Sequence, residues 1–396
     1  MRKFTANRIH PISSPALEKH VLITGDDGTI LAIEPAENHD PATVKKLNGD
    51  LVPGFVNAHC HLELSHMKGK VPTGTGLIPF ITNVVTKRNA SPEAISEAIE
   101  NAEQEMLDGG IVALGDISNT VDTFSVKSKG RMRYYTFLEL FDFLQEEGAE
   151  KTFSDGMAVY DKIQLAKGST CSLVPHAPYS VSKNLFKKIR EFNPPKDITI
   201  SIHNQETPPE ESLFLNKTGD FLNFYSKFGI TLDKFASTGK NAIYYALENL
   251  NPETRNLFVH NTLTSREDIE AAQSWSNMVY WASCPNANLY IENRLPNYQH
   301  FMETNARVAL GTDSLTSNWQ LSILEEMKTI ARFQSYVPFE TLLRWATLNG
   351  AEALGFDDTL GSFDVGKKPG LVLIQGLDGN GVLEASATAE RVLIDN

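Results

Sequence analysis

The sequence predicts an α/β protein, namely a (β/α)8 barrel of the TIM type with a small β-sandwich domain formed by both chain termini. Three observations lead to this prediction. Short runs rich in Val, Ile and Leu alternate with helical patterns through the middle of the chain, and there are eight such runs. Both ends of the chain are rich in strand and turn signals instead. The length of 396 residues leaves room for a barrel of about 250 residues and a small second domain.

The two ends of the chain carry strands joined by turns. Residues 20–35, HVLITGDDGTILAIEP, place two β-rich runs around a DDG turn, which is typical of a hairpin. Residues 361–395 alternate Gly-rich turns with short Val, Leu and Ile runs. We therefore expect residues 1–50 and 357–396 to form the small β-sandwich, and residues 51–356 to form the barrel.

The middle of the chain supplies the barrel strands. Parallel strands buried on both faces are nearly continuous apolar runs, and helices separate them. The eight runs begin at Leu51, Gly110, Arg131, Cys171, Ile198, Asn256, Met278 and Arg307.

Two segments between these runs have clear helix signals. In residues 91–109, Ser91 suits the N-cap, Pro92 suits the first helical position, and Gly109 marks the end. We expect the Glu residues of this helix to face solvent. Its apolar side chains recur at helical spacing and should face the barrel: Ala94, Ile95, Ala98, Ile99, Ala102 and Met106. Ser265 and Asp268 open a similar helix after the sixth run. The long segment between His203 and the sixth run should form helices and a loop that shape a pocket.

The composition argues against several classes of protein. The chain has 36 Lys and Arg against 49 Asp and Glu, a net charge of −13, and no basic stripe, so we expect no nucleic-acid polymer as partner. No segment approaches the ~18 uninterrupted apolar residues of a membrane-spanning helix, and we expect no membrane association. The three cysteines form no CxxC pair, which disfavours disulfides and a cysteine-rich zinc site. We expect a cytoplasmic protein.

Metal-ligating residue types gather where the apolar runs end. In a (β/α)8 barrel the carboxyl ends of all strands meet at one mouth, where the active site lies. On an extended strand alternate side chains point the same way, so the two histidines of the HxH pair share a face. Imidazole nitrogens with a carboxylate suit zinc, and iron(II) also fits. The residues are His59 and His61 after the first run, His176 after the fourth, His203 after the fifth, His260 after the sixth and Asp313 after the eighth.

The set carries more weight than any member. A single histidine near a strand end is more often capped or solvated than a ligand, and this is our interpretation of His66 and His300. Coincidence explains poorly why four possible metal ligands lie at the ends of strands that meet at one barrel mouth. We expect these four to bind one divalent metal: His59, His61, His203 and Asp313.

At these residues the chain resembles the amidohydrolase superfamily, from about Leu51 to Asn349. PGFVNAHCHLE is similar to its first-strand motif, IHNQE to its fifth-strand histidine with a Glu three residues on, FVHN to its sixth strand and GTDSLTSN to its eighth. The flanks resemble its small β-sandwich, although Pro369 and Gly370 stand where Ala-Asp is usual. Two-metal members carry a carboxylated lysine after the fourth strand, whereas this chain has His176 there. The resemblance therefore implies one metal, with zinc first and iron second.

The resemblance also implies a reaction. In the mononuclear deaminase and chlorohydrolase branch, Glu206 would donate a proton to the ring, His260 would stabilise the attacking oxygen, and Asp313 would accept a proton from water. The implied activity is hydrolytic deamination of an aminopurine nucleoside, with aminodeoxyfutalosine or an adenosine derivative as the expected substrate. Expected substrate contacts are His176, Glu63, Asn318 and Trp319.

Other interpretations stay open from the sequence. Glu206 stands in an acidic run and could be a surface residue, and Trp319 could be core packing. The same metal site could hydrolyse a cyclic amide or a ring chloride, and a barrel that only binds a ligand is a third alternative. A homodimer is compatible with the sequence, although no feature demonstrates one.

Overall fold

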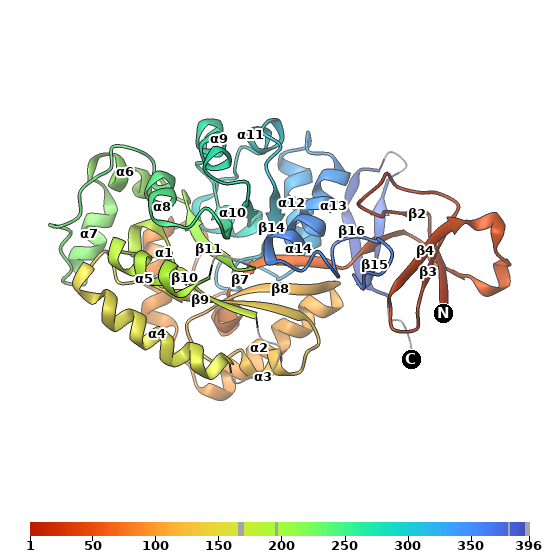
Figure 1. Cartoon of the computed structure of the whole chain (residues 1–396), viewed down its shortest axis with the longest axis horizontal. Coiled ribbons are helices and arrows are strands. Elements are labelled where there is room, and N and C mark those ends of the chain that lie inside the picture. Colours follow the sequence, from red (N-terminus) through yellow and green to blue (C-terminus); the bar gives the residue numbers. More distant parts are fainter. Residues whose placement is uncertain (165–169, 195–196, 379–380, 393–396) are drawn as a thin grey trace.

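The computed structural model describes residues 1–164, 170–194, 197–378 and 381–392. It consists of a barrel with surrounding helices and, beside it, strands from both chain ends (Figure 1). The predicted fold class is confirmed: it is an α/β barrel with N- and C-terminal strands in a separate sheet domain.

The small domain contains two four-stranded sheets. One has the order β4-β3-β1-β5 and comes from the N-terminal segment alone: β1 (Arg2–Thr5), β3 (His20–Thr24), β4 (Ile30–Pro35) and β5 (Lys45–Lys46). The other has the order β16-β15-β6-β2 and joins the two ends of the chain: β2 (Arg8–Ile9), β6 (Asp50–Pro53), β15 (Leu371–Leu377) and β16 (Leu383–Arg391). Phe4 and Leu22 of the first sheet share one apolar core with Leu51 and Leu373 of the second. Residues 393–396, which end the predicted domain, lie outside the described residues.

The barrel strands follow the eight predicted runs. They are β7 (Phe55–Cys60), β8 (Ile111–Ser118), β9 (Arg133–Leu140), β10 (Thr170–Pro175), β11 (Thr199–Asn204), β12 (Arg255–His260), β13 (Val279–Ser283) and β14 (Val308–Leu310). Strands β7 to β10 pair in parallel as one four-stranded half, and strands β11 to β14 as another.

The two halves meet at two seams, between β10 and β11 and between β14 and β7, where few backbone hydrogen bonds join the strands. Beside β10, the backbone N–H of His203 donates to the carbonyl of His176 at 2.9 Å. Beside β7, the N–H groups of Thr312 and Asp313 donate to the carbonyl of His59 at 3.0 and 3.1 Å. Each seam is therefore closed at residues that the sequence places in the functional site.

The run from Leu51, which we expected as one barrel strand, is divided at Gly54. Its first part, β6, pairs with β15 in the small domain, and the barrel strand begins at Phe55. The Gly54 N–H donates to the Pro369 carbonyl at 3.0 Å, and a Cβ at this position would lie 2.3 Å from a methyl group of Val112. Because this close approach leaves no room for a side chain, glycine suits the point where the chain passes between domains.

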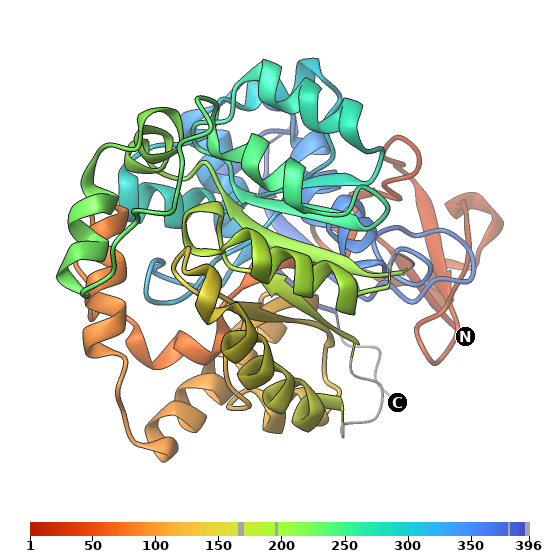
Figure 2. The ribbon, with the colours of Figure 1, turned by 60° about the vertical axis from the view of Figure 1, so that its left-hand side comes forward.

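The helices cover the barrel and extend its mouth (Figure 2). They are α1 (Leu77–Lys87), α2 (Pro92–Asp108), α3 (Phe124–Ser128), α4 (Ala149–Gln164), α5 (Lys183–Phe192), α6 (Pro208–Asn216), α7 (Asp220–Lys227), α8 (Ala242–Asn249), α9 (Arg266–Trp275), α10 (Pro285–Glu292), α11 (Tyr298–Glu303), α12 (Ile323–Phe333), α13 (Phe339–Ala346) and α14 (Leu348–Leu354). In Figure 2 the orange α1 and the green α7 lie side by side at the end away from the small domain.

The predicted capping signals are confirmed, with two corrections on α2, of which the first is that Ala94, expected to face the barrel, is exposed in the first turn. The Ser91 side chain caps α2, and Ser265 forms a capping box with Asp268 on α9. We expected all Glu residues of α2 to face solvent, but Glu103 is fully buried and accepts a hydrogen bond from the Tyr134 hydroxyl at 2.6 Å. Position 103 lies four residues after the buried Ile99, so helical geometry places it on the inner face.

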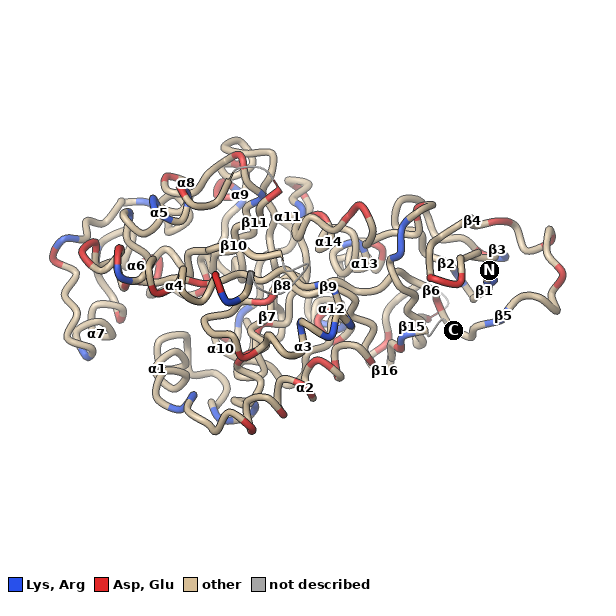
Figure 3. Tube along the Cα trace, turned by 60° about the horizontal axis from the view of Figure 1, so that its bottom comes forward, with Lys and Arg blue, Asp and Glu red and all other residues tan. Residues whose placement is uncertain are grey.

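Acidic and basic residues are intermixed over the trace (Figure 3). Within the described ranges, no helix is long and apolar enough to cross a membrane.

Candidate active site

Three histidines and one aspartate converge at the mouth of the barrel. His59, His61 and His203 each offer one ring nitrogen that lies within 4.8 Å of the nitrogens of the other two. The Nε2 atoms of His61 and His203 are 3.3 Å apart. Oδ1 of Asp313 lies 3.5 Å from Nε2 of His61 and 3.8 Å from Nε2 of His59. The structure thus brings together all four residues that the sequence predicts as metal ligands.

The protonation chemistry of this group fits a metal. Burial lowers the pKa of His59, His61 and His203, to about 3 for His61, so the imidazoles are neutral at pH 7 and keep a lone pair. Neither ring nitrogen of the buried His59 has a hydrogen-bond partner among the described residues. Buried polar atoms without partners are rare, and a cation at the cluster would bind one of these two nitrogens.

Contacts behind two ligands direct their free atoms toward the cluster. The Nδ1–H of His203 donates to the carbonyl of His176 at 2.8 Å, which leaves Nε2 unprotonated. The Ser317 hydroxyl donates to Oδ2 of Asp313 at 2.5 Å, which leaves Oδ1 facing the histidines. Asp313 has φ +55°, a left-handed conformation that is uncommon for residues other than glycine and recurs at active sites.

A carboxyl and an imidazole lie beside the cluster. Oε1 of Glu206 is 3.7 Å from Nε2 of His260, and both side chains are buried. Burial, with Asp313 and Glu292 nearby, raises the pKa of Glu206 well above its usual value. Burial lowers the pKa of His260. Both shifts favour the uncharged forms, a carboxylic acid next to a neutral imidazole, and this suits Glu206 to donate a proton.

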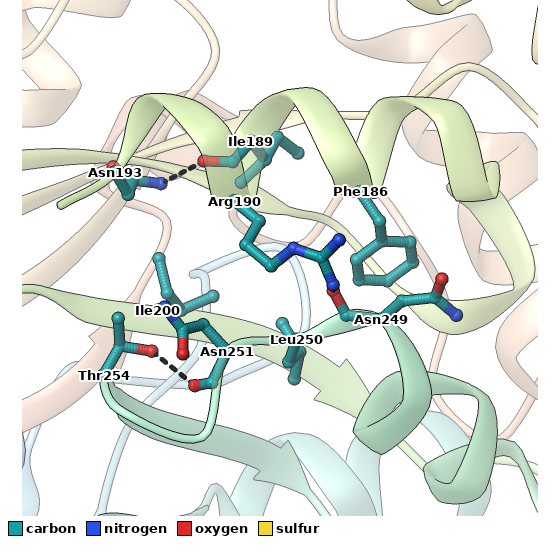
Figure 4. A pocket seen from close by; sticks show the side chains of 9 residues that line it. All are labelled: Phe186, Ile189, Arg190, Asn193, Ile200, Asn249, Leu250, Asn251 and Thr254. Carbon is teal, nitrogen blue, oxygen red and sulfur yellow. Dashed lines mark hydrogen bonds between the residues drawn. The ribbon is translucent and has the colours of Figure 1, made fainter. Parts of the chain in front are cut away.

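The cluster lies in a cavity of about 430 Å³, a size that suits a small molecule. Side chains of α1 and α7 form an apolar wall, which includes Phe80, Val84, Phe224 and Phe228. The segment between β11 and β12 shapes the pocket, as the sequence predicts. Another hollow, between α5 and the turn before β12, holds only about 10 Å³ and has room for little more than one water (Figure 4).

Comparison with known proteins decides the family. The model of the amidohydrolase family matches residues 51–390. The chain belongs to the amidohydrolase family. Together with the ligand cluster, this membership makes it a metal-dependent hydrolase.

Several characterised proteins are similar to this amidohydrolase. An adenosine deaminase of Helicobacter pylori is 28% identical over 331 residues, which cover 82% of this chain and 78% of that protein. The crystal structure of H. pylori aminofutalosine deaminase in complex with methylthio-coformycin gives a TM-score of 0.80 at 23% identity, covering 94% of this chain and 92% of that one. An adenosine deaminase from Xanthomonas campestris with bound zinc gives 0.73 at 23% identity, covering 97% and 86%. The two structural matches show the shared fold.

In this amidohydrolase, His176 lines the cavity next to the cluster. Its ring centroid is 4.8 Å from that of His203, and its Nδ1 lies 2.6 Å from the Ser180 hydroxyl. Glu139 and His176 also come within ligand distance of His203, but this second group shares His203 with the first. A single metal therefore stays a prediction, as does the substrate contact expected of His176, which borders the cavity.

The other three predicted substrate contacts do not line the described cavity. Glu63 is buried and accepts hydrogen bonds from the N–H groups of Asn119 and Thr120 at 3.0 and 3.1 Å. Its carboxylate therefore fixes the backbone after β8, and we revise its role from touching substrate to holding this loop.

Asn318 and Trp319 also do not line the described cavity, so we revise their roles as substrate contacts too. The Asn318 amide donates to the Thr312 carbonyl and to Glu326, both at 2.8 Å, which anchors the loop that carries Asp313. The Trp319 ring is 49% exposed and lies against Tyr290, outside the cavity wall.

Sequence reasoning missed three residues of the site. Glu139, the second-last residue of β9, lines the cavity and is buried, and this burial raises its pKa to about 8. Arg88 follows α1 and lines the same side of the cavity. Asn288 on α10 lies 2.9 Å from Nδ1 of His260 through its side-chain oxygen. A Glu near the end of an apolar run was a signal for Glu139, whereas Arg88 and Asn288 come from helices whose sequences show no such mark.

Proposed function

We propose that this amidohydrolase is a hydrolytic deaminase that removes the exocyclic amine of an aminopurine nucleoside, with aminodeoxyfutalosine or another adenosine derivative as substrate. The observation that carries the proposal is the buried pair of Glu206 and His260 beside the metal-ligating cluster. Release of ammonia from an aromatic ring requires a proton on the ring before attack and a proton on the leaving group afterwards. A carboxylic acid beside the ligands supplies the first proton, and the attacking water supplies the second.

Glu206 acts first, by donating its proton to ring nitrogen N1. This makes C6 electrophilic, and water adds to it. The backbone of Glu206 is held on both sides, because its N–H donates to Glu210 at 3.0 Å and its carbonyl accepts from the Thr262 hydroxyl at 2.5 Å. The carboxyl is therefore positioned for one ring atom, as proton transfer requires.

His260 orients the water. The Asn288 amide places its oxygen 2.9 Å from Nδ1 and its nitrogen 3.5 Å from the backbone carbonyl of His260, which assigns the imidazole proton to Nδ1. Nε2 then carries a lone pair that accepts a hydrogen bond from the attacking water. At φ +72° the backbone of His260 is held in a left-handed conformation, which aims the ring at the cavity.

Asp313 takes the proton that the attacking water loses, because its Oδ1 faces the cluster while Oδ2 is occupied by Ser317. His59, His61, His203 and Asp313 would hold the cation, for which we propose zinc. When bound, such a cation lowers the pKa of water toward ~7 and so supplies the nucleophile at neutral pH. The proton then passes from Asp313 to the amino group, directly or through the Glu206 carboxylate, and the C6–N bond breaks to release ammonia. The hydroxyl proton left on C6 goes to the Glu206 carboxylate, which gives a 6-oxopurine and restores the acid.

The similar proteins support this substrate class. The relatives described above are an adenosine deaminase and an aminofutalosine deaminase, and the structure of the latter is a complex with methylthio-coformycin. The zinc in the X. campestris deaminase supports zinc here. The present cavity of about 430 Å³ is compatible with a nucleoside.

A deamination screen tests the proposal. The purified, zinc-loaded enzyme is assayed with adenosine, S-adenosylhomocysteine, methylthioadenosine, aminodeoxyfutalosine, guanine and cytosine, following absorbance and released ammonia. We expect ammonia from at least one adenosine derivative. Absence of ammonia from all six, with turnover of a cyclic amide or a chlorinated ring, would replace deamination by one of those activities. Metal analysis of the enzyme as isolated tests zinc, and iron is the contrary result.

A further inference from the structure

One oxygen in the cavity wall has no hydrogen-bond partner among the described residues. Oε1 of Glu139 is buried and unpaired, whereas Oε2 accepts from the Asn119 amide at 3.4 Å. The same amide donates to the Glu139 backbone carbonyl at 3.1 Å. The side chain is thus held on one side by Asn119, and Glu139 is one of the residues that line the cavity.

The protein does not offer this oxygen a suitable donor. Nδ1 of His203 is the nearest candidate at 3.5 Å, but its proton is donated to the His176 carbonyl at 2.8 Å. Buried polar atoms left unpaired are destabilising and are uncommon in proteins, so an unpaired carboxyl oxygen in a residue of the cavity wall indicates a ligand that hydrogen-bonds to it.

Strand order separates Glu139 from the reacting end of the site. Glu139 is the second-last residue of β9, whereas Glu206 follows β11 and His260 ends β12. Around the barrel, β10 therefore lies between Glu139 and Glu206, and β10 and β11 lie between Glu139 and His260. In a purine nucleoside, N1 and C6 lie on one edge of the base and the sugar is attached at N9 on the opposite edge. A base that presents N1 to Glu206 therefore directs its sugar away from β12.

The rest of the wall on this side offers few alternatives to Glu139. The helices α1 and α7 contribute apolar side chains to the cavity. The polar groups have partners within the protein: Arg88 contacts Glu63 at 3.5 Å, the Ser180 hydroxyl lies 2.6 Å from Nδ1 of His176, and the Tyr225 hydroxyl is bonded to the Tyr179 carbonyl. The remaining donors of a bound nucleoside are its sugar hydroxyl groups. A chlorinated ring or a cyclic amide would bring no such hydroxyl.

We propose that Glu139 is a specificity-determining residue that binds a sugar hydroxyl group of the nucleoside through Oε1, with Asn119 holding its carboxyl in place. This inference rests on the proposed deaminase function and extends it, because it makes the ribose, and not the base alone, a recognised part of the substrate.

The test compares adenosine with 2′,3′-dideoxyadenosine as substrates of the zinc-loaded enzyme. If adenosine proves a poor substrate, the same pair of sugars is compared on the best nucleoside found in the screen. The wild-type enzyme should prefer the hydroxylated sugar by about 10- to 100-fold in kcat/KM, since a hydrogen bond to a buried carboxyl is lost without it. In Glu139→Leu this preference should fall to within about threefold of unity, through loss of activity on adenosine alone. Metal content should stay unchanged.

Glu103→Gln and Glu139→Gln form a matched pair. Glu103 is a buried carboxyl on α2 that does not line the cavity, so its variant should keep the wild-type sugar preference. Circular dichroism and thermal unfolding establish that each variant folds. If Glu139→Leu does not fold, Glu139→Gln decides by the same loss of preference.

The outcomes separate the two proposals. Equal wild-type rates on both sugars, or an unchanged preference in the folded Glu139 variant, would overturn the role of Glu139 while leaving deamination intact. An equal loss on both sugars would assign Glu139 to holding His203 instead and would also overturn it. A wild-type enzyme that releases ammonia from no aminopurine nucleoside would refute the proposed function itself.

Discussion

Replacing Glu206 with Gln should remove turnover while leaving the metal site loaded. Glu206 is not one of the clustered ligands, and Gln keeps the size of the side chain, so the four ligands should hold metal as before. The backbone contacts of Glu206 to Glu210 and Thr262 do not involve its carboxyl and should persist. The variant lacks only the carboxyl proton that Glu206 donates to ring nitrogen N1.

The size of the loss follows from the surroundings of Glu206. A positioned acid contributes about 10²- to 10⁴-fold to a rate. The other carboxyls lining the described cavity are Asp313, which belongs to the metal cluster, and Glu139, which lies on the β9 side, so neither can replace Glu206. We therefore expect kcat to fall about 10³-fold, equivalent to about 4 kcal/mol, with a small change in KM.

The assay follows ammonia release under saturating substrate, with metal content measured on the same sample. Glu211→Gln is the matched control, because Glu211 stands in the same acidic run but does not line the cavity, and its kcat should stay within about twofold of wild type. A Glu206→Gln enzyme that keeps kcat within about threefold would refute the proton-transfer role. Loss of metal together with activity would show that Glu206 supports the metal site instead.

Three further changes test other parts of the structure. His59→Ala should weaken metal binding by more than about tenfold, measured by metal analysis after dialysis. Glu63→Ala should lower the free energy of unfolding by about 2–4 kcal/mol in denaturant titrations, because two backbone N–H groups and the Thr120 hydroxyl lose their acceptor. Burial raises the pKa of Glu210 from 4.5 to about 8, so folding takes up a proton between these values, and the contribution of Glu210 to stability is lost as pH rises through this window. Glu210→Gln cannot ionise, so its free energy of unfolding should fall less than that of wild type between pH 5 and 8. We expect a difference of about 2 kcal/mol or more, because each pH unit between the two pKa values corresponds to about 1.4 kcal/mol.

Each of these changes has a contrary result. Full metal occupancy in His59→Ala would remove His59 from the ligand set. Wild-type stability in Glu63→Ala would show that water replaces its carboxylate and that the loop after β8 does not depend on it. Parallel pH profiles for Glu210→Gln and wild type would place the pKa of Glu210 near its ordinary value in the folded protein.

The barrel and its metal cluster were predictable because both follow from local patterns. Apolar runs mark strands buried on both faces, and the ends of such strands converge in this architecture. The spacing of His59 and His61 alone places both side chains on one face of β7. A histidine or aspartate that ends an apolar run is also conspicuous, as His203 and Asp313 are.

The remaining site depends on partners far apart in the chain. Glu63 looks like a substrate contact beside His61, yet its carboxylate is occupied by the backbone at Asn119, 56 positions away. Asn318 is likewise occupied by Glu326 of α12. No pattern within either segment reveals these partners. Glu139 was hard to predict for a different reason. It lies within the apolar run that forms β9, so the sequence pattern does not separate it from the strand.

The seams of the barrel give the metal a second significance. His59 and His61 belong to the half formed by β7 to β10, whereas His203 and Asp313 belong to the half formed by β11 to β14. A cation held by all four residues would fasten the two halves at the points where the backbone joins them by only a few hydrogen bonds. Assembly of the barrel and loading of its metal would then be a single cooperative event, and cellular metal supply would govern how much folded enzyme persists as well as how much is active.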